Sequence, residues 1–298
     1  MVLAGGTGGA LLAAGIQSHS PSVRLTVIAN TADDDEFWGL LVCPDIDAVI
    51  YRLAGVFNET TGYGVKDDTF HALDALGRAG GEAWFRLGDK DIATHLLRAE
   101  LLRRGLTLTQ ATLELCERFG VQTRVLPVTN DRVRTRFATD RGEFSFQQYF
   151  VRERLGPRLE GISFEGIESA RPTMEVIEAL STADLVIIGP SNPLISVAPI
   201  LEIVGSLPRE RTLAVSPIVG GVALKGPTIQ MMSALGHPPT PLEVARLYAE
   251  QASRFVLDTR DAEQVREIEV GLGYGVLVCD TVMRDGGESL AAAILRSV

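Results

Sequence analysis

The chain has 298 residues, of which 46% are hydrophobic and 22% charged, and this composition indicates a globular protein with a large buried core. Its formal net charge of −10 argues against a nucleic-acid partner, because binding to phosphate backbones needs surfaces rich in Lys and Arg. No apolar run is as long as the roughly 18 residues that a membrane-spanning helix needs. The N-terminus lacks the basic segment of a signal peptide. Cys43, Cys116 and Cys279 have neither metal-ligand nor disulfide spacing. We therefore expect a cytoplasmic protein with no membrane partner.

A glycine-rich loop at residues 5–9 follows a short apolar segment and precedes an apolar helix. Glycine lets a phosphate approach the backbone closely, and the free N–H groups at a helix start point toward such an anion. The glycine spacing matches neither a P-loop nor the G-x-G-x-x-G dinucleotide motif. The loop is thus a phosphate cradle of another kind, or a tight strand-to-helix turn without a ligand. Because only residues 1–4 precede it, we expect an unusually short first strand or a start codon farther upstream.

Strands and helices alternate along the chain. Residues 24–30 form a buried strand after the first helix, which predicts a βαβ unit and hence a parallel sheet. Continuous apolar strands follow at 184–190 and 212–217, and such uninterrupted runs suit a sheet covered on both faces. The chain returns to this pattern at its end, with a strand at 275–280 and a helix at 289–297. The fold is predicted to be α/β, with a Rossmann-like, mostly parallel sheet and helices on both faces.

Two segments depart from this alternation. Apolar residues recur at helical spacing between about 67 and 120, which predicts a helical insertion that lids a site. Between about 121 and 166 the pattern is strand-like, and residues 140–142 form a good hairpin turn. We expect a single α/β domain over 1–298, with the helical insertion and a small β subdomain as parts of it.

Several polar loops follow the predicted strands, at residues 5–9, 30–35, 189–193 and 216–221. An open α/β sheet binds its ligand beyond the carboxyl ends of its strands, so these loops are expected to meet at one edge. The residues that we expect to bind the phosphates of a ligand there are Gly5, Gly6, Thr7, Gly8, Gly9, Ser191, Asn192, Pro193, Ser216, Pro217 and Gly220.

Acidic residues gather near the same edge, first at residues 33–36 and then as Asp45 and Asp47, which open an apolar helix. One interpretation is structural: Asp45 caps the helix and Asp47 adds a favourable charge to its first turn. The other is that carboxylates beside a phosphate cradle hold Mg²⁺ or receive a proton from an attacking hydroxyl. Asp45 is our candidate for the metal ligand.

A second charged cluster lies at residues 88–91. It either caps the helix predicted from residue 92 to 104 or places Lys90 as a point charge on a phosphate. The four histidines have no metal-ligand spacing, and only His95 lies near a candidate site.

The chain resembles the 2-phospho-L-lactate transferases (CofD-like proteins) of deazaflavin coenzyme F420 biosynthesis. The matching stretches run through nearly the whole chain in order, at residues 5–9 (GGTGG), 30–34 (NTADD), 44–47 (PDID), 66–70 (KDDTF), 87–95 (LGDKDIATH), 189–193 (GPSNP) and 216–220 (SPIVG). One departure is that Leu11 and Leu12 stand where the family commonly has a Lys after the glycine loop.

This resemblance implies transfer of a phospho-acid group from a guanosine diphosphate-linked donor to the ribityl hydroxyl of 7,8-didemethyl-8-hydroxy-5-deazariboflavin (FO). The products are F420-0 or its dehydro form and GMP, and Mg²⁺ is required. The resemblance also implies that Asp47 and Lys90 contact the acceptor. We expect Asp47 to be the catalytic residue, one that orients or deprotonates the attacking hydroxyl. We further expect a homodimer. The sequence leaves open whether the donor carries 2-phospholactate or enolpyruvyl phosphate.

Two other functions compete with this one. A sister family of gluconeogenesis-factor type binds nucleotide sugars without catalysis and shares the glycine loop and the acidic loop, but lacks the combination of residues 44–47 and 88–95. A nicotinamide-dependent dehydrogenase is disfavoured because the glycine spacing is wrong for that cofactor.

Overall fold

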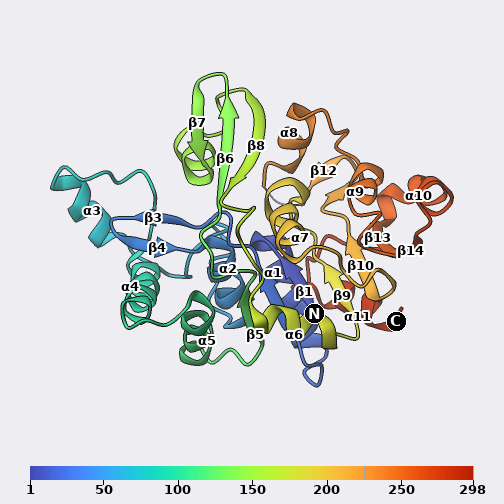
Figure 1. Cartoon of the computed structure of the whole chain (residues 1–298), viewed down its shortest axis with the longest axis horizontal. Coiled ribbons are helices and arrows are strands. Elements are labelled where there is room, and N and C mark those ends of the chain that lie inside the picture. Colours follow the sequence, from blue (N-terminus) through green and yellow to red (C-terminus); the bar gives the residue numbers. More distant parts are fainter. Residues whose placement is uncertain (225, 298) are drawn as a thin grey trace.

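The computed structural model describes residues 1–224 and 226–297, and a seven-stranded sheet forms its centre (Figure 1). The strand order is β14-β13-β10-β9-β1-β2-β5, and every neighbouring pair is parallel. The predicted α/β, Rossmann-like fold is therefore confirmed. Its strands are β1 (Val2–Ala4), β2 (Thr26–Ala29), β5 (Arg124–Pro127), β9 (Val186–Ile188), β10 (Thr212–Val215), β13 (Arg254–Asp258) and β14 (Gly275–Cys279).

Helices cover both faces of the sheet because successive strand side chains point to opposite sides. In β1, for example, Val2 and Ala4 pack into one buried cluster and Leu3 into the other. The first cluster is completed by α1 (Gly6–His19), α2 (Pro44–Leu53), α5 (Leu108–Arg118) and α11 (Glu288–Arg296). The second is completed by α6 (Met174–Thr182), α7 (Ala198–Val204), α9 (Pro241–Leu247) and α10 (Val265–Leu272).

The direction of the chain reverses between β1 and β9. After β1 the chain crosses through α1 to β2, whereas after β9 it passes through a π-helical turn (Pro193–Val197) and α7 to β10 on the other side. The loops that follow β1 and β9 therefore separate at the carboxyl edge of the sheet. Open α/β sheets bind their ligands at such a switch point.

The predicted helical insertion contains α3 (His71–Arg78), α4 (Asp89–Arg103) and α5, joined by an irregular stretch at residues 79–88. A short hairpin of β3 (Asp35–Phe37) and β4 (Leu40–Val42) precedes α2 and was not predicted, because its first strand is largely acidic. These elements extend from one end of the molecule (left in Figure 1).

The predicted β region is a three-stranded antiparallel sheet, with β6 (Arg134–Thr139) between β7 (Gly142–Ser145) and β8 (Leu159–Glu165). The turn at residues 140–142 joins β6 to β7 as predicted. This sheet stands away from the main one, at the top of Figure 1. The remaining elements are β11 (Ile218–Val219), β12 (Val222–Ala223), α8 (Thr228–Ala234), a π-helical turn (Gln148–Arg152) and 3-10 turns at Arg209–Arg211 and Thr259–Gln264. Within the described ranges, no helix has the length and apolar character needed to cross a membrane.

Candidate active site

A cavity of about 600 Å³ opens at the switch point between β1 and β9. Its walls come from the glycine loop, the start of α2, the start of α4, the loop after β9, and the segment that carries the π-helical turn Gln148–Arg152. The cavity thus brings together three regions that the sequence singled out separately, namely the loops at 5–9 and 189–193 and the helix start at residues 44–47.

Within the glycine loop, most glycines are required by packing alone. A Cβ on Gly8 would strike the carbonyl oxygen of Pro190, and one on Gly5 would strike the side chain of Ser196. Gly6 differs, since its φ is +64° and its Cβ would meet only Asp45 Oδ1, at 3.3 Å. The backbone N–H of Gly5 donates to Ser191 Oγ at 3.2 Å, which ties the loop after β1 to the loop after β9. The cradle is therefore built from two interlocked loops, and Gly6 is its one open position.

The structure brings together only part of the predicted phosphate-binding set. The residues that line the cavity are Gly5, Gly6, Thr7, Gly8, Ser191 and Asn192. The residues that do not line it are Gly9, Pro193, Ser216, Pro217 and Gly220. Of these, Gly220 donates its N–H to Asp261 at 2.8 Å, and Ser216 hydrogen-bonds to Ile218 in its own turn. Leu11, where the family commonly has Lys, packs against the buried cluster on its face of the sheet and offers no charge to a phosphate.

Asp33 and Asp45 line the cavity together with the glycine loop, and both accept hydrogen bonds from the side-chain amide of Asn30. Asn30 donates through its Nδ2 to Asp45 Oδ2 at 2.9 Å and to Asp33 Oδ2 at 3.3 Å. The cap of α2 is Cys43, which makes no side-chain cap bond, so Asp45 does not act as the helix cap. The capping interpretation of Asp45 is therefore wrong, and its carboxylate faces the glycine loop instead.

The negative charges of Asp33 and Asp45 are buried without a cationic side chain among the described residues to balance them. Burial raises the pKa of Asp45 to about 6, against the effect of its bonds to Asn30 and the Gly6 backbone. Burial also raises the pKa of Asp33 well above its ordinary value, and the charge of Asp45 raises it further. Across residues 1–224 and 226–297, neither carboxylate has a cationic side chain within ion-pair distance. A bound cation would stabilise the ionised form of both carboxylates and so offset the free-energy penalty of burying their charge.

The residues present fit a divalent oxygen-liganded ion only together with a ligand. No group of three or more His, Cys, Asp or Glu side chains is arranged to hold a metal in the described part of the chain. Mg²⁺ is commonly held by one or two carboxylates plus substrate phosphates, and Asp33 and Asp45 beside a phosphate cradle supply that arrangement. The sequence pointed to Asp45 alone, since nothing in it showed that Asn30 would draw Asp33 to the same place.

Asp47 lies deeper in the same wall and is bound by Arg98 of α4. Arg98 Nη2 pairs with Asp47 Oδ1, and Arg98 Nη1 donates to Asp47 Oδ2 at 3.2 Å. Burial tends to lower the pKa of Arg98, but the charge of Asp47 outweighs that effect and the pKa is raised. Both oxygens of Asp47 are thus engaged by a fully buried guanidinium. Nothing in the sequence predicted this pair, because Arg98 lies on another helix 51 residues away.

Lys90 does not reach the cavity. Its Nζ is exposed and donates to the backbone carbonyl of Lys66 at 3.1 Å. Asp68, from the preceding loop, caps α4 by accepting from the backbone N–H groups of Lys90 and Asp91 at 2.8 and 3.1 Å. Asp89 in turn accepts from the first N–H groups of α3. The cluster therefore does not cap its own helix as expected: α4 begins at Asp89 and is capped by Asp68, while Asp89 caps α3. Contact of Lys90 with an acceptor stays a prediction of the resemblance.

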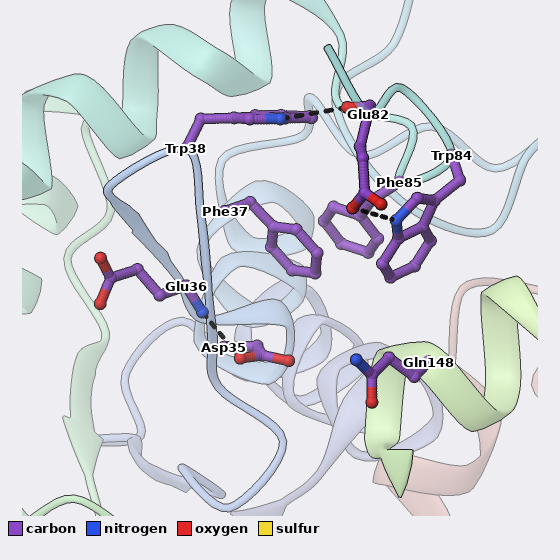
Figure 2. Close-up of a pocket in the computed structure, with 8 residues that line it drawn as sticks. All are labelled: Asp35, Glu36, Phe37, Trp38, Glu82, Trp84, Phe85 and Gln148. Atoms are coloured by element: carbon purple, nitrogen blue, oxygen red, sulfur yellow. Dashed lines mark hydrogen bonds between the residues drawn. The ribbon is translucent and has the colours of Figure 1, made fainter.

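Another part of the cavity wall is aromatic. Its side chains come from the irregular stretch at 79–88 and from residues 146–150 around the start of the π-helical turn, and they are Trp84, Phe85, Phe146 and Phe150. A smaller hollow of about 350 Å³ lies behind Trp84 and Phe85, which also line it (Figure 2).

Figure 2 shows how Trp84 and Phe85 of this aromatic wall are fixed. Phe37 stacks on Phe85 with ring centroids 3.9 Å apart, and Trp84 packs edge-on against Phe37. Glu82 accepts from both neighbouring indoles, from Trp38 through its carbonyl at 3.1 Å and from Trp84 through its carboxylate at 3.3 Å. A large planar surface next to the cavity is thereby held in place, as recognition of a planar ring system requires.

Comparison with known proteins places the whole chain in one family. Residues 1–272 match the family model described as 2-phospho-L-lactate transferase CofD. The chain is 38% identical to the 2-phospho-L-lactate transferase of Methanopyrus kandleri, over 100% of this chain and 96% of that protein. It is also 38% identical to the phosphoenolpyruvate transferase of Streptomyces coelicolor, over 90% of this chain and 88% of that protein.

Among solved structures, a member of the upf0052 family from Bacillus halodurans has the same fold, with a TM-score of 0.59 and 18% identity over 99% of this chain and 98% of that one. That likeness supports the fold alone, whereas the sequence relatives support an enzyme. The chain therefore belongs to the 2-phospho-L-lactate transferase CofD family of enzymes.

Proposed function

We propose that this enzyme transfers a phospho-acid group from a guanosine diphosphate-linked donor to the ribityl hydroxyl of FO, releasing GMP. The observation that carries the proposal is the composition of one cavity. Its lining combines a glycine cradle and two buried carboxylates with a group of aromatic side chains. A diphosphate suits the cradle and a planar deazaflavin suits the aromatic side chains. The names of the relatives from Methanopyrus and Streptomyces support either 2-phospholactate or enolpyruvyl phosphate as the transferred group.

The donor diphosphate is proposed to lie on the cradle. α1 begins at Gly6, so the backbone N–H groups of its first turn beyond Gly6 have no partner within the helix and can bind an anion. Ser191 and Asn192 face the same space from the loop after β9. Because Leu11 supplies no charge, we assign phosphate binding to backbone N–H groups and to an ion at Asp33 and Asp45.

We propose that Asp33 and Asp45 hold Mg²⁺ together with oxygens of the donor diphosphate. When bound, Mg²⁺ neutralises the charge that builds on the leaving phosphate and polarises the phosphate under attack. The protein contributes two buried carboxylates next to the cradle, both held by Asn30.

The acceptor is proposed to place its ring on the aromatic wall and its ribityl chain toward the glycine loop. Asp47 accepts a hydrogen bond from this chain, since its carboxylate lines the cavity while Arg98 holds it in one orientation. The hydroxyl oxygen then forms a bond to the phosphorus of the phospho-acid group, and the bond from phosphorus to the GMP oxygen breaks. Catalysis of this type rests mainly on positioning and electrostatic stabilisation.

A binding experiment separates this function from the nucleotide-sugar regulator. Calorimetry with FO, GDP, a UDP-sugar and NAD, each with Mg²⁺, compares the candidate ligands directly. We expect binding of FO and GDP, and neither of the others at comparable concentration. Tight binding of the UDP-sugar without binding of FO would favour the regulator.

A further inference from the structure

Four carboxylates line the cavity, and their surroundings divide them into groups with different chemistry. Asp33 and Asp45 share Asn30 at the cradle, and both oxygens of Asp47 are engaged by Arg98. The fourth, Asp91 in the first turn of α4, has a side chain that is 9% exposed. Its Oδ1 accepts a hydrogen bond from Tyr51, whereas no described residue donates to its Oδ2.

Asp91 is held by one oxygen and open at the other. Tyr51 donates its hydroxyl to Asp91 Oδ1 at 2.7 Å. The other oxygen, Oδ2, lies next to Gly64, which also lines the cavity: a Cβ built on Gly64 would stand 3.6 Å from it. Burial raises the pKa of Tyr51 well above its ordinary value, and the charges of Asp47 and Asp91 add to this effect, so the phenol stays a donor. Asp91 is thereby oriented without losing its second oxygen.

His95 supplies a second, independent sign that a ligand belongs here. Its Nδ1 lies 3.1 Å from Arg98 Nη1, and because a guanidinium only donates, Nδ1 must accept and the proton is assigned to Nε2. His95 is 1% exposed and lines the cavity, yet Nε2 has no hydrogen-bond partner in the described ranges. Nε2 lies 3.3 Å from Asp91 Oδ1 without the alignment of a hydrogen bond. A buried donor of this kind calls for a partner.

We propose that Asp91 is the proton acceptor for the attacking hydroxyl, an inference that rests on the proposed function. As the hydroxyl oxygen bonds to phosphorus and the bond to the GMP oxygen breaks, the proton of the hydroxyl passes to Asp91 Oδ2. The electron pair of the broken bond stays on GMP. Tyr51 is a positioning residue that holds the carboxylate through Oδ1. His95 places Nε2 beside the same oxygen, and its Nδ1 side is held by the Asp47–Arg98 pair. In this arrangement Asp91 of α4 takes the proton, and Asp47 of α2 only orients the acceptor.

The test compares Asp91→Asn with the wild type in steady-state kinetics. We expect kcat to fall by about 10²–10⁴-fold, the range for loss of a general base, while KM for both substrates and the melting temperature stay near their wild-type values. Tyr51→Phe should lower kcat by about tenfold, since it removes one hydrogen bond to a charged group. Asp74→Asn is the matched control, because Asp74 is an exposed carboxylate on α3 of the same insertion and does not line the cavity.

Chemical rescue separates a proton acceptor from a structural carboxylate. Asp91→Ala leaves space beside the cavity, and added formate should restore its turnover at least tenfold without changing Asp74→Asn. If the wild type turns over and Asp91→Asn keeps kcat within threefold, or formate fails to rescue Asp91→Ala, the assignment is overturned while the proposed function stands. If the wild type itself does not use FO, the proposed function fails and this inference fails with it.

Discussion

Asp47 and Arg98 form a two-point ion pair that joins the start of α2 to the middle of α4, and the guanidinium is fully buried. The pair fixes the helical insertion against the sheet at the wall of the cavity. It also makes Asp47 more than a first-turn charge on its helix. The stability of the insertion and the geometry of the acceptor end therefore depend on the same contact.

Breaking this pair should unfold the protein more easily than a surface substitution does. Asp47→Asn and Arg98→Met should each lower the free energy of unfolding by about 3–5 kcal/mol, because each leaves an uncompensated buried charge or donor. The double variant should lose clearly less than the sum of the two. Denaturant melts of the three variants measure this coupling, and additive losses would show that the pair contributes nothing of its own.

The glycine cradle can be tested at the one position where packing leaves room. Gly6→Ala should raise the donor KM by about tenfold, because the added Cβ stands next to Asp45 at the free N–H groups of α1. Its left-handed φ should also cost about 1–2 kcal/mol of stability. Gly120→Ala is the control, since Gly120 has a φ of +71° with open space around it and lies outside the cavity. Equal effects of both variants on donor KM would remove the cradle role.

The metal proposal predicts that turnover stops in EDTA and returns with Mg²⁺ or Mn²⁺, since a site of carboxylate and phosphate oxygens accepts either ion. Asp45→Asn should raise the Mg²⁺ concentration needed for half-maximal rate, and Asp35→Asn should not, because Asp35 does not line the main cavity. The readout is the initial rate across a Mg²⁺ titration. Full turnover in excess chelator would exclude the metal role of Asp33 and Asp45.

The aromatic wall predicts a specific loss of acceptor binding. Trp84→Leu should raise the KM for FO by about tenfold and leave the donor KM unchanged, since stacking on an aromatic side chain is worth about 1–3 kcal/mol. Trp38→Leu is the matched control, because Trp38 bonds to the same Glu82 but lines only the smaller hollow. If the two variants behave alike, the ring of FO does not rest on Trp84.

The sequence predicted the central sheet well and the site only in part. Buried strands such as those at 184–190 and 212–217 are readable because their apolar runs are continuous. The strand Asp35–Phe37 was missed because two of its three residues are acidic, and its pairing with Leu40–Val42 is a tertiary feature. The end of the polar loop expected after the second strand therefore belongs to the hairpin of β3 and β4 instead.

For the site, local motifs located the helix starts but not which side chains face each other. The fold carries Lys90, which the sequence singled out, to the surface, and brings Arg98, which it did not, inward from the same helix. The loop at 216–221 lies at the carboxyl edge as predicted, yet it does not line the main cavity. Such outcomes depend on helix rotation and on contacts between distant segments, which periodicity does not encode.

The most direct test of the central claim is release of GMP from a guanosine diphosphate-linked donor that carries 2-phospholactate or enolpyruvyl phosphate, measured with and without FO. We predict GMP release that depends on FO and Mg²⁺, with one molecule of phospho-acid-bearing deazaflavin detected by mass spectrometry for each GMP. GMP release at the same rate without FO, or no deazaflavin product with either donor, would contradict the account.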